Sequence, residues 1–291
     1  MRVVVTGAAG MLGRAMMAGL TSAGHEAVGR TRADYDITDH AAASRDFAAL
    51  RPDAVVNCAA YTRVDDAEDE PDQAMEINGR APGRMAVVAA AVGARFAQLS
   101  TDYVFNGHGD RPWREDDPTN PLSAYGRSKL LGEREVIKAA PDTHLIVRAS
   151  WLFGAGGRSF PRAMIERYQR GEREFRVVDD QFGRPTWTRH LARALVGCLE
   201  KGLTGIYHAG NAGAMSWFEF ARLIFLRLGA ADEVRVRAVS SDEWKARAVR
   251  PRYSVLDTGK LEAALGFTLP GTVEALDGFL AETGMTGPKE D

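Results

Sequence analysis

The chain of 291 residues lacks the features that mark secreted, membrane-spanning or nucleic-acid-binding proteins. Its two cysteines, Cys58 and Cys198, are too few for a disulfide framework and belong to no C-x-x-C or Cys/His cluster. No uninterrupted apolar run approaches the roughly 20 residues that span a bilayer, and the N-terminus has no signal-peptide pattern. With 37 basic and 39 acidic residues, the net charge is −2. We therefore expect a cytoplasmic protein with no membrane or nucleic-acid partner.

The sequence also lacks the arrangements that hydrolases and metalloenzymes use. Its 6 histidines are scattered, and no pair has the helical spacing of metal ligands beside a carboxylate. No G-x-S-x-G segment is present to form the nucleophile elbow of a serine hydrolase. The acidic run Asp65–Glu70 precedes Pro71, and a solvated loop with a helix start explains it without a metal. We expect neither a metal ion nor hydrolysis.

Three glycines follow a β-branched run at the first positions of the chain. Val3, Val4 and Val5 are typical of a central parallel strand buried on both faces. Gly7 permits a tight turn, Gly10 lets the backbone approach a pyrophosphate, and Gly13 lets the following helix pack closely on the sheet. Free N–H groups at that helix N-terminus would then face the phosphates. This segment predicts a dinucleotide-binding site.

Strand and helix patterns alternate through the first 150 residues. We expect strands at His25–Gly29, Asp53–Asn57, Ala94–Leu99 and His144–Ala149, helices at Met11–Ala23, Pro71–Val92 and Leu122–Ala139, and a short helix capped by Thr38 or Asp39 that ends near Leu50. Strands joined through helices require crossovers, so the sheet should be parallel with helices on both faces. The predicted fold is α/β, a Rossmann-like doubly wound parallel sheet over residues 1–150 that binds the cofactor.

The regular alternation of strand and helix patterns ends after residue 150. We expect helices at Phe160–Arg170, Trp187–Glu200 and Trp217–Leu228, with strands at Phe175–Val178 and Gly205–His208. Residues 151–291 should form a smaller, mixed substrate-binding lobe, with some chain returning to the first domain. The segment Asn106–Pro121 is rich in Gly, Pro and Asp, and we expect it to be irregular and to cover a site. The polar tail Thr286–Asp291 is expected to fray.

A tyrosine and a lysine lie four residues apart in a predicted helix. Tyr125 and Lys129 therefore share one helix face, about 6 Å apart along the axis. An ammonium at 4–6 Å contributes roughly 3–4 kcal/mol at an effective dielectric near 20, which is enough to lower a phenol pKa by about 3 units. The pair follows a strand that ends in Ser100 and Thr101. This arrangement indicates proton transfer by Tyr125.

The spacing G-x-x-G-x-x-G, Asn57-Cys58-Ala59-Ala60 and Y-x-x-x-K together resemble the extended branch of the short-chain dehydrogenase/reductase superfamily. Within that branch, further segments over nearly the whole chain resemble the dTDP-4-dehydrorhamnose reductases: Ser100–Phe105, Tyr125–Glu133, Arg148–Gly154, Asp180–Thr186, and Arg250–Pro251 before Ser254–Asp257. The related sugar-nucleotide dehydratases have a glutamate where Tyr103 stands, so dehydration is disfavoured.

The resemblance implies an NADPH-dependent oxidoreductase that reduces the 4-keto group of dTDP-4-dehydro-6-deoxy-L-mannose to dTDP-L-rhamnose. Thr101 would hydrogen-bond the carbonyl, Tyr125 would donate the proton, and Lys129 would hold the nicotinamide ribose while lowering the tyrosine pKa. The cofactor would contact Gly7, Gly10, Met11, Leu12, Gly13, Arg30, Arg32, Asp36, Ile37, Cys58, Ala59, Ala60, Asn78, Tyr125 and Lys129. The substrate would contact Thr101, Asp102, Tyr103, Trp151, Gln181 and Arg250.

Two departures from the family pattern carry expectations of their own. Many members have an acidic residue at the end of the second strand, where this chain has Arg30 and Arg32. Two guanidiniums without a carboxylate favour a 2′-phosphate, so NADPH should be preferred over NADH. Some members dimerise through magnesium held by glutamates, where this chain has Ala15 and Arg189. We therefore expect no metal and a monomer or weak homodimer.

Two alternatives remain open at this point. A 4-ketoreductase of another nucleotide-linked deoxysugar would share the catalytic set, because the sugar pocket comes from loops that one sequence does not place. A cofactor-binding regulatory subunit without turnover would share the fold. Intact Thr101, Tyr125, Lys129 and Trp151 favour catalysis.

Overall fold

The computed structural model describes residues 1–285, so the predicted fraying of Thr286–Asp291 falls outside the described residues. The central sheet has six strands in the order β10-β5-β4-β3-β1-β2, and all of its pairings are parallel. Its strands are β1 (Arg2–Thr6), β2 (Glu26–Arg30), β3 (Ala54–Asn57), β4 (Arg95–Thr101), β5 (His144–Ala149) and β10 (Gly205–Ala209). The predicted doubly wound parallel sheet is confirmed.

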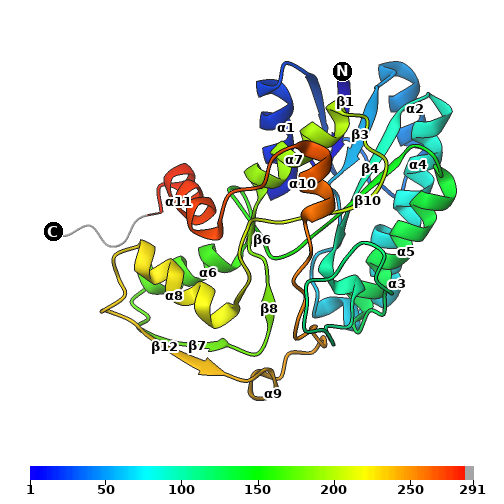
Figure 1. Cartoon of the computed structure of the whole chain (residues 1–291). Helices are drawn as coiled ribbons and strands as arrows, with labels where there is room; N and C mark the ends of the chain where they lie inside the picture. Colours follow the sequence, from blue (N-terminus) through cyan, green and yellow to red (C-terminus); the bar gives the residue numbers. More distant parts are fainter. Residues whose placement is uncertain (286–291) are drawn as a thin grey trace.

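The two faces of the sheet pack against different helices, as alternation along each strand requires. Val3 and Val5 of β1 pack with α1 (Met11–Ser22), α7 (Thr188–Glu200) and α10 (Gly259–Leu265). Val4 packs on the opposite face in a cluster that includes α2 (His40–Leu50), α4 (Ala81–Ala91) and α5 (Ala124–Ala139). Figure 1 shows these two helix layers on either side of the sheet. Both faces are covered, so the strands are apolar throughout.

A second apolar cluster lies beyond the central sheet. It is formed by α6 (Phe160–Gln169), β7 (Glu174–Val178), α8 (Trp217–Arg227), β12 (Arg235–Val239) and α11 (Thr272–Thr283). Figure 1 places β7, β12 and α8 below the sheet edge. Short strands complete this region: β6 (Leu152–Phe153), β8 (Phe182–Gly183), β9 (Thr186–Trp187) and β11 (Met215–Ser216), with the single-turn helix α9 (Ser241–Trp244). The chain after residue 150 thus supplies both this cluster and one strand of the sheet.

One predicted helix differs in its interior. Residues 71–92 do not form one continuous α-helix: α3 (Pro71–Ala74) runs into π-helical turns, η2 (Met75–Arg80), before α4 begins. The wider turns contain Asn78, which is buried and bonded to backbone outside the helix. π-Turns are frequent at functional sites. Hydrophobic periodicity predicts a helix here but not the insertion that turns Asn78 inward.

The segment Asn106–Pro121 has no helix or strand, as predicted, but it lines neither of the cavities described below. Trp113 stacks on Phe105 with ring centroids 4.7 Å apart. Its backbone N–H donates to the carbonyl of Val255 at 2.8 Å, and its indole N–H donates to the carbonyl of Tyr253 at 2.8 Å. The segment therefore fastens residues 253–257 to the sheet domain, and the expectation that it covers a site is not supported.

Candidate active site

The glycine-rich turn between β1 and α1 has the geometry that its sequence predicts. Gly7 adopts φ +66°, and a Cβ there would lie 2.6 Å from the backbone nitrogen of Ala59. A Cβ on Gly13 would lie 2.1 Å from the carbonyl oxygen of Gly7. Gly10 is the N-cap of α1 and has no side chain in front of the free N–H groups. A pyrophosphate fits this cradle because only backbone reaches its rim.

Side chains at the carboxyl ends of the neighbouring strands hold the adjoining turn. The Thr6 hydroxyl donates to Asn57 Oδ1 at 2.5 Å, and Asn57 Nδ2 donates to Gln98 Oε1 at 2.8 Å. Asn57 Oδ1 also accepts from the backbone N–H of Ala59 at 3.2 Å. This buried ladder across β1, β3 and β4 fixes the turn at residues 58–60 against the glycines.

A cavity of about 550 Å³ opens over this edge of the sheet. It is lined by thirteen of the fifteen predicted cofactor-binding residues, namely Gly7, Gly10, Met11, Leu12, Arg30, Arg32, Asp36, Ile37, Cys58, Ala59, Ala60, Tyr125 and Lys129. The other two, Gly13 and Asn78, do not line the cavity but support the residues that do. Gly13 seats α1, and Asn78 holds the backbone of Tyr61 on both sides, with bonds of 2.8 and 2.9 Å. Its lining runs from Arg32 through the glycine-rich turn to Lys129, as a site for a dinucleotide requires.

The arginines at the far end of this cavity are not free of carboxylates, contrary to the prediction. Arg30 donates to both oxygens of Asp46 on α2, at 2.8 and 2.7 Å, and its side chain is 22% exposed. Arg32 is 84% exposed and lies 3.2 Å from Asp36. Asp46, which α2 turns toward β2, therefore already pairs with Arg30 through both of its oxygens. Arg32 is the guanidinium more available to a 2′-phosphate.

Tyr125 and Lys129 point into the cavity that the glycine turn bounds. Both line it from α5, whose start Ser123 caps by accepting from the backbone N–H of Gly126. Thr101, the last residue of β4, is buried and does not line this cavity; its hydroxyl donates to Asp102 Oδ1 at 2.9 Å, and it lies near enough to Tyr125 to influence the pKa of the phenol. Tyr125 and Lys129 are thus brought together in the cavity, and Thr101 lies next to Tyr125.

The pKa of Tyr125 is raised to about 12, which differs from the predicted lowering. Burial is the main cause, the carboxylate of Asp102 adds to it, and the neighbouring side chain of Thr101 opposes it. Lys129 donates to the carbonyl oxygen of Leu99 at 2.5 Å. The four-residue spacing predicts a nearby ammonium charge but does not predict that the phenol is buried. Burial disfavours the phenolate more than that charge favours it. Tyr125 therefore keeps its proton at neutral pH.

Burial lowers the pKa of Lys129 to about 8, while Glu133 one helical turn further along α5 raises it. Glu133 is itself buried in a bidentate pair with Arg148 of β5, with bonds of 2.9 and 2.7 Å. The Ser100 hydroxyl donates to the same carboxylate at 2.5 Å. Sequence reasoning missed Glu133, although its position eight residues after Tyr125 places it on the same helix face.

The predicted substrate residues fall into two groups. Asp102 and Tyr103 lie next to Tyr125: burial raises the pKa of Asp102 to about 6, and the Tyr103 ring meets the Tyr125 ring edge-on at 5.7 Å. Gln181 and Arg250 line a second cavity of about 220 Å³. Its other lining residues include Phe160, Arg167, Arg176, Trp217 and Trp244. Sequence reasoning missed these five, which are scattered along the chain and form no motif.

Trp151 lines neither cavity. It has φ +50°, and its ring stacks on Trp217 with centroids 3.4 Å apart. A Cβ on Gly183 would lie 2.4 Å from its ring, which explains the glycine in the Asp180–Thr186 segment. Trp151 therefore packs against Trp217, which lines the second cavity. The contact of Trp151 with the sugar stays a prediction.

Across residues 1–285, no three His, Cys, Asp or Glu side chains gather as a metal site would require. No helix in that range combines the length and apolar character of a membrane span.

Comparisons with known proteins agree with this site. The family model described as the RmlD substrate binding domain matches residues 1–285. A dTDP-4-dehydrorhamnose reductase of Streptomyces griseus is 49% identical over 268 residues, covering 90% of this chain and 88% of that protein. A dTDP-4-keto-6-deoxy-D-glucose reductase of Streptomyces niveus is 44% identical over 255 residues, covering 88% of each. The crystal structure of dTDP-4-dehydrorhamnose reductase from Bacillus anthracis in complex with NADP has a TM-score of 0.92 at 36% identity, covering 97% of this chain and 99% of that chain. The chain belongs to the RmlD family, that of the dTDP-4-dehydrorhamnose reductases.

Proposed function

We propose that this protein reduces the 4-keto group of dTDP-4-dehydro-6-deoxy-L-mannose to give dTDP-L-rhamnose, using NADPH. One observation carries the proposal: Tyr125 and Lys129 line the same cavity as the glycine-rich turn. The relatives named above and the NADP of the Bacillus anthracis structure support the substrate and the cofactor. A nicotinamide cofactor would supply the hydride.

The residues of this chain would hold the ketone and supply the proton. Thr101 would hydrogen-bond the carbonyl oxygen beside Tyr125. Tyr125, kept neutral by burial, would donate its phenolic proton to that oxygen as negative charge develops on it, since an alkoxide is far more basic than a phenolate. Lys129 would anchor the cofactor ribose and offset the phenolate charge after transfer, because it lies one helical turn away on α5.

The nucleotide part of the substrate would occupy the second cavity. Arg167, Arg176 and Arg250 bring guanidiniums to its wall, and these match a diphosphate. Trp217 and Phe160 offer flat apolar faces to a base or sugar. Residues 1–150 would then form the cofactor domain and residues 151–291 the substrate lobe, with β10 returning to the sheet.

The same proposal places the enzyme in the cytoplasm as a monomer or weak homodimer that needs no metal. Both cysteines are free thiols, which suits a reducing compartment.

The Tyr125→Phe variant tests the assigned chemistry. Loss of a general acid should lower kcat by about 10²–10⁴-fold, while the affinity for NADPH, measured by fluorescence titration, stays within about twofold. Full turnover by Tyr125→Phe would reject the assignment.

A second candidate follows from one comparison. The Streptomyces niveus relative is named for a ketone of the D-gluco series, so this chain could act on another dTDP-linked 4-ketone with the same catalytic set. Comparing kcat/KM for the two epimeric ketones separates the two functions.

A further inference from the structure

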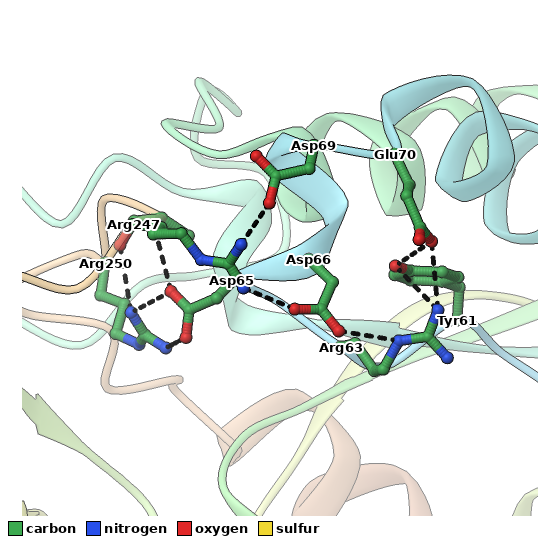
Figure 2. A network of polar contacts seen from close by, with 9 residues as sticks. Tyr61, Arg63, Asp65, Asp66, Asp69, Glu70, Arg247 and Arg250 are labelled. Atoms are coloured by element: carbon green, nitrogen blue, oxygen red, sulfur yellow. Dashed lines mark hydrogen bonds and ion pairs between the residues drawn. The ribbon is translucent and has the colours of Figure 1, made fainter.

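The acidic run at residues 65–70 is partly exposed and leads into a helix start, as predicted, but its carboxylates also pair with arginines far along the chain. Asp65 accepts hydrogen bonds from both terminal nitrogens of Arg250, at 3.1 and 2.7 Å, and from the backbone N–H of Ala248 at 3.0 Å. Figure 2 shows this contact, which joins residues far apart in the sequence. The guanidinium holds the pKa of Asp65 below its usual value. Asp65 is therefore an ionised partner of Arg250 at neutral pH.

A second arginine ties the same two segments together. Arg247 donates to Asp66 at 2.6 Å and pairs with Asp69. Asp66 lies between two guanidiniums, because Arg63 contacts its other oxygen at 2.9 Å (Figure 2). We call the set Asp65, Asp66, Asp69, Arg247 and Arg250 the acidic clasp. The clasp binds the segment after α9 to the loop after β3.

The other side of the acidic run is anchored to the catalytic helix. Glu68 Oε1 accepts from the backbone N–H of Ala124, the first residue of α5, at 2.7 Å. Asn78, which holds the backbone of Tyr61, also donates to the Ser128 hydroxyl of α5 at 3.0 Å. The loop thus has a fixed position relative to Tyr125. Because the acidic clasp binds Arg250 to this loop, Arg250 is held in a fixed position relative to Tyr125 as well.

Arg250 is where this chain of contacts meets the substrate region. It lines the second cavity and lies close enough to Tyr103 to interact with it electrostatically, and the Tyr103 ring meets Tyr125. Its terminal nitrogens donate twice to Asp65 and once to the carbonyl of Ala248. Of the five N–H groups of a guanidinium, these bonds account for three. Two N–H groups remain for other partners, and Arg250 lines the cavity that a ligand would enter.

We propose that Asp65 is a positioning residue for the nucleoside diphosphate substrate. It fixes the plane of the Arg250 guanidinium, so that the remaining N–H groups meet the diphosphate in one preset orientation. A long, flexible side chain held in its bound orientation loses less entropy on binding. The inference rests on the proposed function, which gives Arg250 a phosphate to bind.

The Asp65→Asn variant tests the proposal in the full-length protein. Asparagine keeps an oxygen for the Ala248 amide but loses the bidentate ion pair. We expect the Kd for dTDP, measured by calorimetry, and the KM for the nucleotide-sugar ketone to rise about tenfold, with kcat and the Kd for NADPH changed less than twofold. Asp72→Asn is the matched control, because Asp72 is an exposed acid in the next helix, outside the clasp. It should change none of these values.

A double variant separates positioning from a general structural effect. On an Arg250→Gln background, Asp65→Asn should add less than twofold to the Kd for dTDP, because its effect passes through the guanidinium. If Asp65 had only a structural role, Asp65→Asn would have the same effect on the Arg250→Gln background as on wild type. It would also lower the melting temperature and would not change KM without changing kcat. Asp65→Glu, which keeps the charge, should recover part of the affinity.

The outcomes distinguish this inference from the function on which it rests. Wild-type protein that neither binds dTDP nor oxidises NADPH with the ketone would overturn both. Wild-type activity together with an unchanged dTDP affinity in Asp65→Asn would overturn the positioning role alone. Tighter dTDP binding by Asp65→Asn would also overturn it, since Asp65 would then compete with the diphosphate for Arg250.

Discussion

Replacing Lys129 by methionine should stabilise the fold while it damages the enzyme. The Lys129 side chain is 4% exposed, and burial lowers its pKa from 10.5 to about 8. A shift of about 2.5 units, at about 1.4 kcal/mol each, means that holding the ammonium in the folded protein at pH 7 costs roughly 3 kcal/mol. Methionine removes that cost and fills a similar volume.

The gain is partly offset by a lost hydrogen bond. Lys129 donates to the carbonyl of Leu99, but the side chain of Gln98 donates to the same oxygen at 2.9 Å, so the carbonyl is not left unpaired. We assign about 1 kcal/mol to the loss. The expected net effect is a stabilisation of about 2 kcal/mol, or roughly 4–8 °C in Tm for a chain of this size.

The pH dependence of folding stability shows in which direction Lys129 acts. Because the folded-state pKa of Lys129 lies below the unfolded value, the unfolded chain binds more protons between pH 8 and 10.5, and wild-type stability rises across that window. The advantage of Lys129→Met over wild type should therefore be full below pH 8 and fall by about 3 kcal/mol by pH 10.5, where the lost hydrogen bond leaves the variant about 1 kcal/mol less stable than wild type. Denaturant titrations at pH 7, 9 and 10.5 measure it.

Activity should move the opposite way. If Lys129 holds the ribose, Lys129→Met should raise the Kd for NADPH by about tenfold or more and lower kcat as well, because the residue serves binding and proton transfer. Lys138→Met, an exposed substitution on the same helix, is the control and should change neither property appreciably. A less stable Lys129→Met protein at pH 7, or an advantage that grows with pH, would refute the reasoning.

Three further predictions follow from other parts of the site. Glu133→Ala leaves the Arg148 guanidinium buried without its carboxylate and should destabilise the protein by about 3–5 kcal/mol in denaturant titrations; an effect below about 1 kcal/mol would contradict the burial of the pair. Treatment with EDTA should leave activity and the size-exclusion profile unchanged, since Ala15 and Arg189 offer no carboxylate ligands; loss of either would show that a metal is needed. The ratio of kcat/KM for NADPH to that for NADH should exceed 1 and fall in Arg32→Ala, and equal efficiencies in wild type would reject a 2′-phosphate site.

Local patterns predicted the parts of the site that are themselves local. The strand, turn and helix around Gly7 and Gly13 are contiguous; the φ of +66° requires glycine at position 7, and the carbonyl oxygen of Gly7 requires it at position 13. The pairing of Tyr125 with Lys129 follows from helical spacing alone. These features need no knowledge of distant residues, so the sequence suffices for them.

The parts that were missed depend on long-range packing. Asp46 reaches Arg30 because α2 packs on the sheet, and Asp65 reaches Arg250 although 185 residues separate them. No periodic pattern in the sequence predicts either of these ion pairs. The raised pKa of Tyr125 has the same origin, because desolvation depends on everything that covers the phenol.

The most direct test of the central claim is an assay with purified protein, NADPH and dTDP-6-deoxy-4-hexulose, followed at 340 nm with and without the epimerase that supplies the L-configured ketone. The account predicts rapid oxidation of NADPH and formation of dTDP-L-rhamnose when the epimerase is present, and little oxidation without it. Oxidation that does not depend on the epimerase would assign a different ketone, and no oxidation under either condition would contradict the claim that Tyr125 and Lys129 form a reductase site.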